Sequence, residues 1–142
     1  MYTIQHAVNN FGASSMYFAA SNYFGLLVDA SYNWTANFYH AGAAYGCHAK
    51  AAGPINNELV YLVSTYQTTT GQGALYRDGV LQCSIQGPTD GGLLDGNSGT
   101  QISFGVAGAV EPMTGFLCHP LILASSVTAA QALQMYQTEI GQ

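Results

Sequence analysis

The chain has 142 residues, of which 49% are hydrophobic and 6% are charged, and its formal net charge at pH 7 is -5. A length of this order predicts a single domain over 1–142 that can bury its own core without a disulfide or a metal. Its two cations, Lys50 and Arg77, cannot form the clustered positive surface that binds phosphates, so the composition excludes a nucleic-acid partner. Typical domains have about 25% charged residues, and so uncharged a surface favours a homo-oligomer or a larger particle.

The N-terminal third of the chain contains short apolar runs separated by turn residues, a pattern that predicts strands. These strands are Met16–Ala20, Phe24–Ala30 and Ala36–Ala41. Polar residues such as Asn9 and Ser14 interrupt the uncharged N-terminal stretch, which argues against a membrane-spanning helix. No Lys or Arg precedes Lys50, whereas a secretory signal begins with positive residues. We therefore expect no signal peptide, no transmembrane segment and no membrane partner.

The rest of the chain continues the same pattern, with a clear turn in its middle. Further strands are expected at Tyr45–Ala51, Leu59–Thr65, Ala74–Arg77, Val80–Ile85, Gln101–Val106 and Gly115–Leu123. Asp78-Gly79 predicts a two-residue type I′ hairpin, because that turn needs positive φ at both central positions. After the turn, strict alternation would place Leu81, Cys83 and Ile85 on one face.

A Gly-rich loop and a short helix complete the expected elements. Gly87 to Thr100 is too rich in glycine and turn formers for regular structure, so we expect an exposed loop. Thr128 and Gln131 stand in the spacing of a capping box at a helix N-terminus. The apolar face of this helix would contain Ala129, Ala132, Leu133 and Tyr136, with Gly141 at its end.

Two stretches together carry a family resemblance. Leu59 to Ser64 is a buried strand that leads to the hairpin of Leu75 to Val80, and Gly115 to Leu123 leads into the capped helix. This order resembles the concanavalin A-like lectin/glucanase jelly roll, in the version found in laminin G-like and pentraxin-like domains. The resemblance implies an all-β fold, an antiparallel two-sheet jelly-roll sandwich with one short C-terminal helix. It covers residues 46–142 best, whereas residues 1–45 are less regular and rich in aromatics.

The cysteines predict thiols more readily than a disulfide framework. Cys47, Cys83 and Cys118 are odd in number and show no C-x-x-C spacing, which favours reduced, buried side chains. Cys47-His48 and Cys118-His119 raise the alternative of a zinc site. Adjacent side chains on a strand point to opposite faces, however, so one ion could not easily collect both members of a pair.

Aromatic and amide residues interleave between Tyr17 and Tyr45. Such sets can bind sugars, because an aromatic face packs against the C–H side of a pyranose while amides bond its hydroxyls. The candidate glycan-binding residues are Tyr32, Asn33, Trp34, Asn37 and Tyr39. The alternative, which the pattern favours, is that alternate aromatics fill the core and the others contact a neighbouring subunit.

Calcium is the metal that the family resemblance implies, held by oxygen ligands from a loop. The candidate ligands are Asp90, Asp95 and Asn97 in the Gly-rich loop. Asp and Asn also serve turns through their own backbone hydrogen bonds, and this alternative stays open. We expect no other cofactor.

The acidic residues argue against an enzyme. Retaining glycosidases need two carboxylates about 5 Å apart, and jelly-roll glycosidases supply them from a Glu-x-Asp-x-Glu strand that this sequence lacks. The sequence also lacks a Gly-x-Ser-x-Gly elbow, a P-loop and a His-Glu-x-x-His motif. We therefore predict no catalytic residues, with a glycoside hydrolase as a distant alternative.

These observations predict a non-enzymatic structural or binding module. The main hypothesis is a capsid-decoration or fibre protein on the surface of a bacteriophage virion, made in the host cytoplasm. Laminin G-like modules occur in such proteins, and reduced cysteines and an uncharged surface suit the role. Its partners would be copies of itself or other capsid proteins, with glycans as a further ligand. The alternative is a free-standing carbohydrate-binding lectin.

Overall fold

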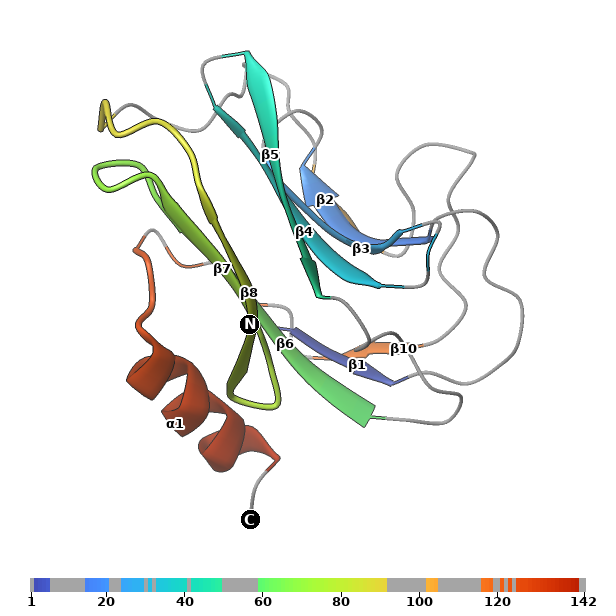
Figure 1. Ribbon diagram of the computed structural model, residues 1–142. Coiled ribbons are helices and arrows are strands. Elements are labelled where there is room, and N and C mark those ends of the chain that lie inside the picture. Colours follow the sequence, from blue (N-terminus) through green and yellow to red (C-terminus); the bar gives the residue numbers. More distant parts are fainter. Residues whose placement is uncertain are drawn as a thin grey trace.

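The computed structural model describes residues 2–5, 15–20, 24–29, 31, 33–40, 42–49, 59–91, 102–104, 116–118, 121, 123 and 125–140. These residues form two five-stranded antiparallel sheets and one helix (Figure 1). Sheet A contains, in spatial order, β10 (Phe116–Cys118), β1 (Tyr2–Gln5), β6 (Leu59–Gln67), β7 (Gln72–Arg77) and β8 (Val80–Gln86). Sheet B contains β5 (Ala43–Ala49), β4 (Trp34–His40), β3 (Phe24–Val28), β2 (Ser15–Ala20) and β9 (Ile102–Phe104).

The predicted fold class, an all-β antiparallel two-sheet sandwich with a C-terminal helix, is confirmed. Each predicted strand has a counterpart in the structure, although β4 begins at Trp34, two residues before the predicted Ala36. Strand β1 was not predicted, because the four residues Tyr2–Gln5 are too few to show alternation. It nevertheless lies between β6 and β10 in sheet A.

The core lies between the two sheets and follows from alternation along the strands. On β4, Trp34, Ala36 and Phe38 point inward and are at most 3% exposed. They pack against side chains of β3, β5, β6 and β7. The residues between them, Thr35 and Asn37, consequently point to the opposite, outer face of sheet B.

The hairpin of β7 and β8 closes on the predicted turn. Asp78 has a φ of 53° and Gly79 a φ of 77°, which confirms the prediction from the Asp-Gly pair. The predicted alternation is wrong at Leu81, because a bulge shifts the register and pairs Leu81 with Tyr76. Leu81 therefore faces outward and is 51% exposed.

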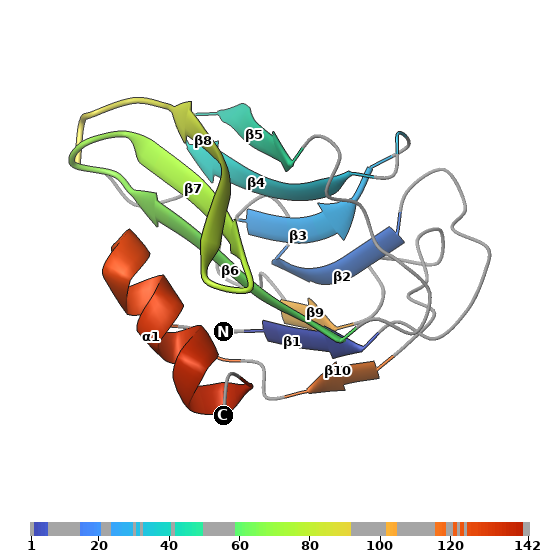
Figure 2. The same cartoon turned by 60° about the horizontal axis from the view of Figure 1, so that its bottom comes forward.

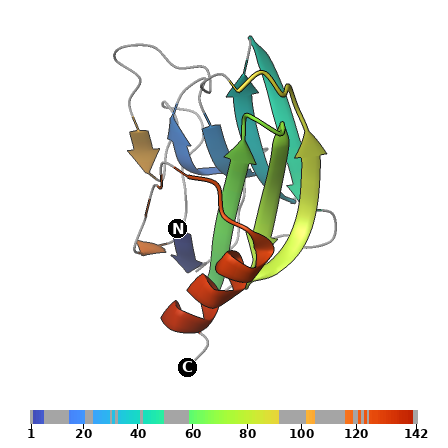
Figure 3. The same cartoon turned by 90° about the vertical axis from the view of Figure 1, so that its left-hand side faces the viewer.

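Helix α1 (Ala129–Glu139) covers the outer face of sheet A (Figures 2 and 3). The predicted capping box is present: Thr128 Oγ1 accepts from the Gln131 N–H, and Gln131 Oε1 accepts from the Thr128 N–H. The buried side of the helix contains Ala132, whereas the predicted Leu133 is 41% exposed. Met135 and Tyr136 complete the contact with sheet A. Within the described residues, no helix is long and apolar enough to span a bilayer.

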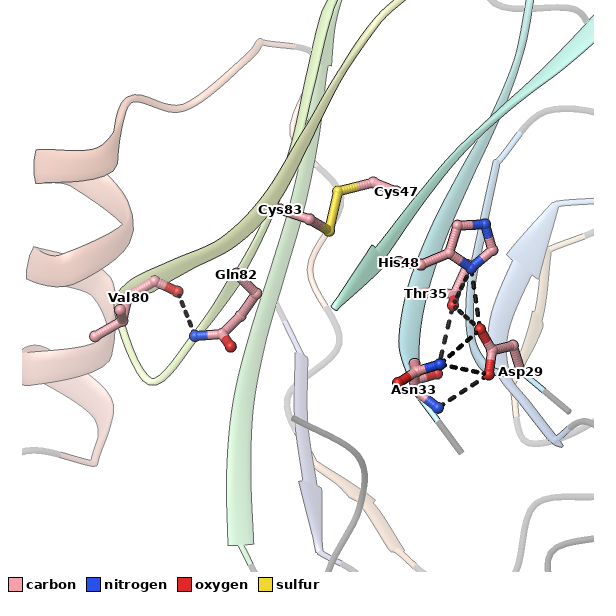
Figure 4. The surroundings of a disulfide bond; sticks show 8 residues. All are labelled: Asp29, Asn33, Thr35, Cys47, His48, Val80, Gln82 and Cys83. Atoms are coloured by element: carbon pink, nitrogen blue, oxygen red, sulfur yellow. Dashed lines mark hydrogen bonds and ion pairs between the residues drawn. A yellow bond between two sulfur atoms is a disulfide. The ribbon is translucent and has the colours of Figure 1, made fainter. Parts of the chain in front are cut away.

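A disulfide joins the two sheets, which corrects the prediction of reduced thiols for two of the three cysteines. Cys47 on β5 is bonded to Cys83 on β8, with their Cα atoms 5.8 Å apart (Figure 4). Both strands are the last in their sheets, and both side chains point into the sandwich. Sequence spacing could not show this pairing, because it depends on how the two sheet edges meet. The side chain of Cys118 lies outside the part of the chain that the structure describes.

Candidate functional site

The outer face of sheet B differs from that of sheet A because no described helix covers it (Figure 1). On this face β4 contributes Thr35, Asn37 and Tyr39. Antiparallel pairing sets these residues opposite three positions of β5, namely His48, Gly46 and Ala44. The two strands thus form a strip of polar and small residues, which we call the β4–β5 strip.

Asp29 anchors one end of the β4–β5 strip. It follows β3, and its carboxylate accepts hydrogen bonds from the backbone N–H groups of Ser31 at 2.9 Å and Asn33 at 3.0 Å. The side-chain amide of Asn33 donates to the same carboxylate at 3.2 Å, and the Thr35 hydroxyl donates at 3.3 Å. These bonds fix the turn between β3 and β4 and hold the carboxylate in one position.

The same hydrogen bonds set the charge of Asp29. Burial alone would raise the pKa of this carboxyl, but donors from the Asn33 backbone, His48, the Asn33 side chain and Ser31 outweigh it and lower the pKa to about 2. Asp29 therefore carries a full negative charge at neutral pH.

Asp29 should make the stability of the fold depend on acidic pH. Its folded-state pKa lies below its ordinary value of 3.8, so its stabilisation is complete above about pH 5 and is lost as the pH falls toward about 2. We expect Asp29→Asn to lower the free energy of unfolding by up to about 2 kcal/mol at pH 7 and by little at about pH 2. Urea unfolding of both proteins across this range measures the effect. An equal difference at both ends would contradict it.

His48 is the most exposed polar group of the strip, with 50% of its side chain accessible. Its Nδ1 lies 3.0 Å from Asp29 Oδ2 and 3.1 Å from Thr35 Oγ1 (Figure 4). A carboxylate can only accept, so Nδ1 carries the proton and Nε2 of the neutral ring is an acceptor. The Asp29 carboxylate therefore orients the ring so that an acceptor is available to a ligand.

Gly46 separates His48 from Asn37 and brings their polar tips together. A Cβ at this position would lie 2.9 Å from Asn37 Oδ1 and 2.9 Å from His48 Nε2. Only a residue without a side chain lets both tips lie over the strand at this distance. The result is a pair of hydrogen-bonding groups side by side above bare backbone.

The β4–β5 strip is exposed to solvent on its β5 side and buried on its β3 side. His48 and Ala44 are exposed, and Asn37 and Tyr39 are partly exposed. On the β3 side, Leu27 is 8% exposed and Thr35 is 1% exposed. Three kinds of group thus follow one another along the accessible side of the strip. The ring of Tyr39 comes first, the polar side chains of Asn37 and His48 follow, and the carboxylate of Asp29 stands at the end.

The predicted glycan residues divide between two faces. Asn37 and Tyr39 lie on the β4–β5 strip, and Asn33 joins the Asp29 network at its end. Trp34 is 0% exposed and lies in the core, so its ring is not available to a sugar. Tyr32 lies outside the described residues. The structure therefore brings three of the five predicted residues toward one surface.

The predicted calcium ligands are not seen as a set. Asp90 Oδ1 lies 2.6 Å from Nε2 of His40, whose side chain is 3% exposed. This contact ties the segment after β8 to β4 and engages one carboxylate oxygen. Asp95 and Asn97 lie outside the described residues, so calcium binding stays a prediction.

The zinc alternative gains no support where the structure describes its residues. Cys47 and His48 leave β5 toward opposite faces, as the alternation argument expected (Figure 4). Cys47 is engaged in the disulfide, and His48 contacts Asp29. Among the described residues, no group of three or more His, Cys, Asp or Glu side chains could hold a metal.

Sequence reasoning missed Asp29, His48 and Gly46 as members of the site. Asp29 follows a predicted strand and begins a turn, a position at which side chains often serve only the backbone. His48 stands next to Cys47, and this pairing indicates at most a zinc ligand. The link between residues 29 and 48 arises from the pairing of three strands, which local spacing does not reveal.

Comparison with known proteins supports the fold. The sequence matches no known protein family and no curated protein. The structure is similar to the crystal structure of a protein of Bacteroides ovatus, provisionally assigned as carbohydrate-binding, with a TM-score of 0.72 and 16% sequence identity. The match covers 94% of this chain but 39% of that protein. At this identity the similarity establishes a shared β-sandwich fold.

Proposed function

We propose that this protein is a non-enzymatic carbohydrate-binding module and that the β4–β5 strip is its binding face. The observation that carries the proposal is the pair of polar tips, His48 Nε2 and Asn37 Oδ1, held above Gly46 beside the partly exposed ring of Tyr39. Sugars present vicinal hydroxyl groups next to an apolar C–H face. The two polar tips can bond the hydroxyl groups, and the tyrosine ring can pack against the C–H face.

The proposed role of each residue follows from its chemistry. His48 Nε2 accepts a hydrogen bond from one hydroxyl, and the Asn37 amide bonds a neighbouring one. Tyr39 packs against the ring of the sugar. Asp29 acts as a positioning residue, because its carboxylate fixes the orientation of the His48 ring. The similarity to the Bacteroides ovatus protein agrees with this class of function.

His48→Ala and Gly46→Ala should each weaken glycan binding strongly while the fold persists. The first removes the acceptor, and the second introduces a methyl group 2.9 Å from both polar tips, which must then move apart. Loss of these hydrogen bonds should weaken binding at least tenfold. A glycan array on the wild type, followed by calorimetry with the strongest hit on each variant, measures the effect.

Gln82→Ala is the matched control, because Gln82 lies on β8 in the other sheet and bonds only locally, to the Val80 carbonyl, in the described contacts. It should bind as the wild type does. Retained binding by both His48→Ala and Gly46→Ala would remove the β4–β5 strip as the site. A wild type that binds no glycan would refute the proposed function itself.

A role on a virion surface and membership of the concanavalin A-like jelly-roll class are finer proposals. The two-sheet sandwich suits that class, and the low charge content suits assembly. Because Cys47 and Cys83 form a disulfide, reduced cysteines no longer support the virion role. We therefore rank the carbohydrate-binding role above the structural one.

A further inference from the structure

We infer that the β4–β5 strip selects uncharged saccharides and rejects those that carry carboxylate or sulfate groups. The inference rests on the proposed function and adds the chemical class of the ligand. It follows from the fixed charge of Asp29 near the strip and from the absence of a lysine or arginine among the described residues of the strip.

The strip presents a negative charge at the point where a ligand must approach. Asp29 Oδ2 lies 3.0 Å from His48 Nδ1, so the carboxylate is one imidazole ring away from the proposed hydrogen-bonding atom Nε2. The side chain of Asp29 is 21% exposed, so its field reaches the surface. Its other partners are neutral donors that orient it without cancelling the charge.

Recognition of an acidic sugar requires a cation, preferably a guanidinium that bonds the anion with two N–H groups. The only arginine, Arg77, belongs to β7 in sheet A, and its Nε lies 3.4 Å from Asp78 Oδ2. The only lysine, Lys50, lies outside the described residues. Within the described part of the strip, Asp29 and His48 are the ionisable groups besides Tyr39, and none is a permanent cation.

The size of the expected discrimination follows from Coulomb's law. A ligand anion bonded beyond His48 Nε2 lies on the order of 8 Å from the Asp29 carboxylate, a separation at which two like charges at a protein surface weaken binding by roughly twofold to thirtyfold, depending on the effective dielectric constant. An acidic saccharide should therefore bind about threefold to tenfold more weakly than its neutral counterpart at low salt. Because salt screens exposed charges, the ratio should shrink severalfold at about 1 M NaCl.

The test uses pairs of probes that differ only by an anionic group. Galactose with galactose 6-sulfate, N-acetylglucosamine with its 6-sulfate, and methyl-esterified oligogalacturonates with the free acids are titrated at about pH 8, where histidine is ordinarily neutral. We expect the neutral members to bind, with their acidic partners about threefold to tenfold weaker in about 50 mM NaCl. Equal or tighter binding of an acidic member would overturn the inference while the proposed function stands. No binding by any probe, together with no binding on the glycan array, would refute the proposed function as well.

Two variants identify the source of the discrimination. Asp29→Asn should bring the acidic and neutral affinities to within about 1.5-fold of each other, even if both fall because the His48 ring is less well fixed. The readout is this ratio, which a loss of positioning alone would not change. Arg77→Gln, which removes a positive charge from β7 in the other sheet, should leave the ratio as in the wild type. A ratio that persists in Asp29→Asn, or one that changes in Arg77→Gln, would contradict the assignment to Asp29.

Discussion

Trp34→Ala should destabilise the protein by about 3–5 kcal/mol, a large part of the stability of a typical domain. The indole of Trp34 is 0% exposed and packs in the core between the sheets, so its removal loses buried apolar surface and leaves a cavity. Chemical denaturation followed by far-ultraviolet circular dichroism measures the change without depending on tryptophan emission.

Tyr39→Ala is the natural comparison, because Tyr39 is on the same strand but on its outer face. It should change stability by less than about 1 kcal/mol and should weaken glycan binding instead. The opposite result, a stable Trp34→Ala protein that no longer binds glycans, would show that Trp34 belongs to the site. Since Trp34 is the only tryptophan, glycan binding at the β4–β5 strip should leave the emission spectrum of the wild type nearly unchanged.

Loss of the bond between Cys47 and Cys83 should lower stability by about 3–4 kcal/mol. The bond closes a loop with a sequence separation of 36, which restricts the unfolded chain, and it joins the edge strands of the two sheets. Denaturation of the wild type with and without dithiothreitol, and of the Cys47→Ser/Cys83→Ser double variant, gives the value.

A thiol count separates the disulfide from the sequence-based prediction of reduced cysteines. Under denaturing, non-reducing conditions one thiol per chain should react if the bond is present, and three should react if all cysteines are reduced. Cys118→Ser should leave no reactive thiol and should keep the dependence of stability on dithiothreitol. Stability that does not respond to dithiothreitol would contradict the proposed contribution of the bond.

The fold was predictable because its signals are local. Alternating apolar residues marked the strands, Asp78-Gly79 marked the hairpin, and Thr128 with Gln131 marked the start of the helix. The errors arose where a tertiary contact changes a local pattern. A bulge turned Leu81 outward, and the fit of α1 on sheet A buries Ala132 rather than Leu133.

The candidate site was only partly predictable. The main error was to include Trp34, and it arose because the predicted strand began at Ala36 instead of Trp34. Had β4 been predicted to begin at Trp34, alternation would have separated Trp34 and Phe38 from Asn37 and Tyr39. The amide and the tyrosine would then have remained on one face as a smaller site. The link between Asp29 and His48 required the pairing of β3, β4 and β5, which no spacing in the sequence encodes.

The position of α1 determines how this protein could be mounted on a support. The helix packs on the outer face of sheet A, and the β4–β5 strip belongs to the other sheet, so the whole thickness of the sandwich separates them (Figure 1). A tether fused beyond Ile140, where α1 ends, would leave from the helix side. Immobilised in this way on a sensor chip or a bead, the protein would display its strip toward the solution.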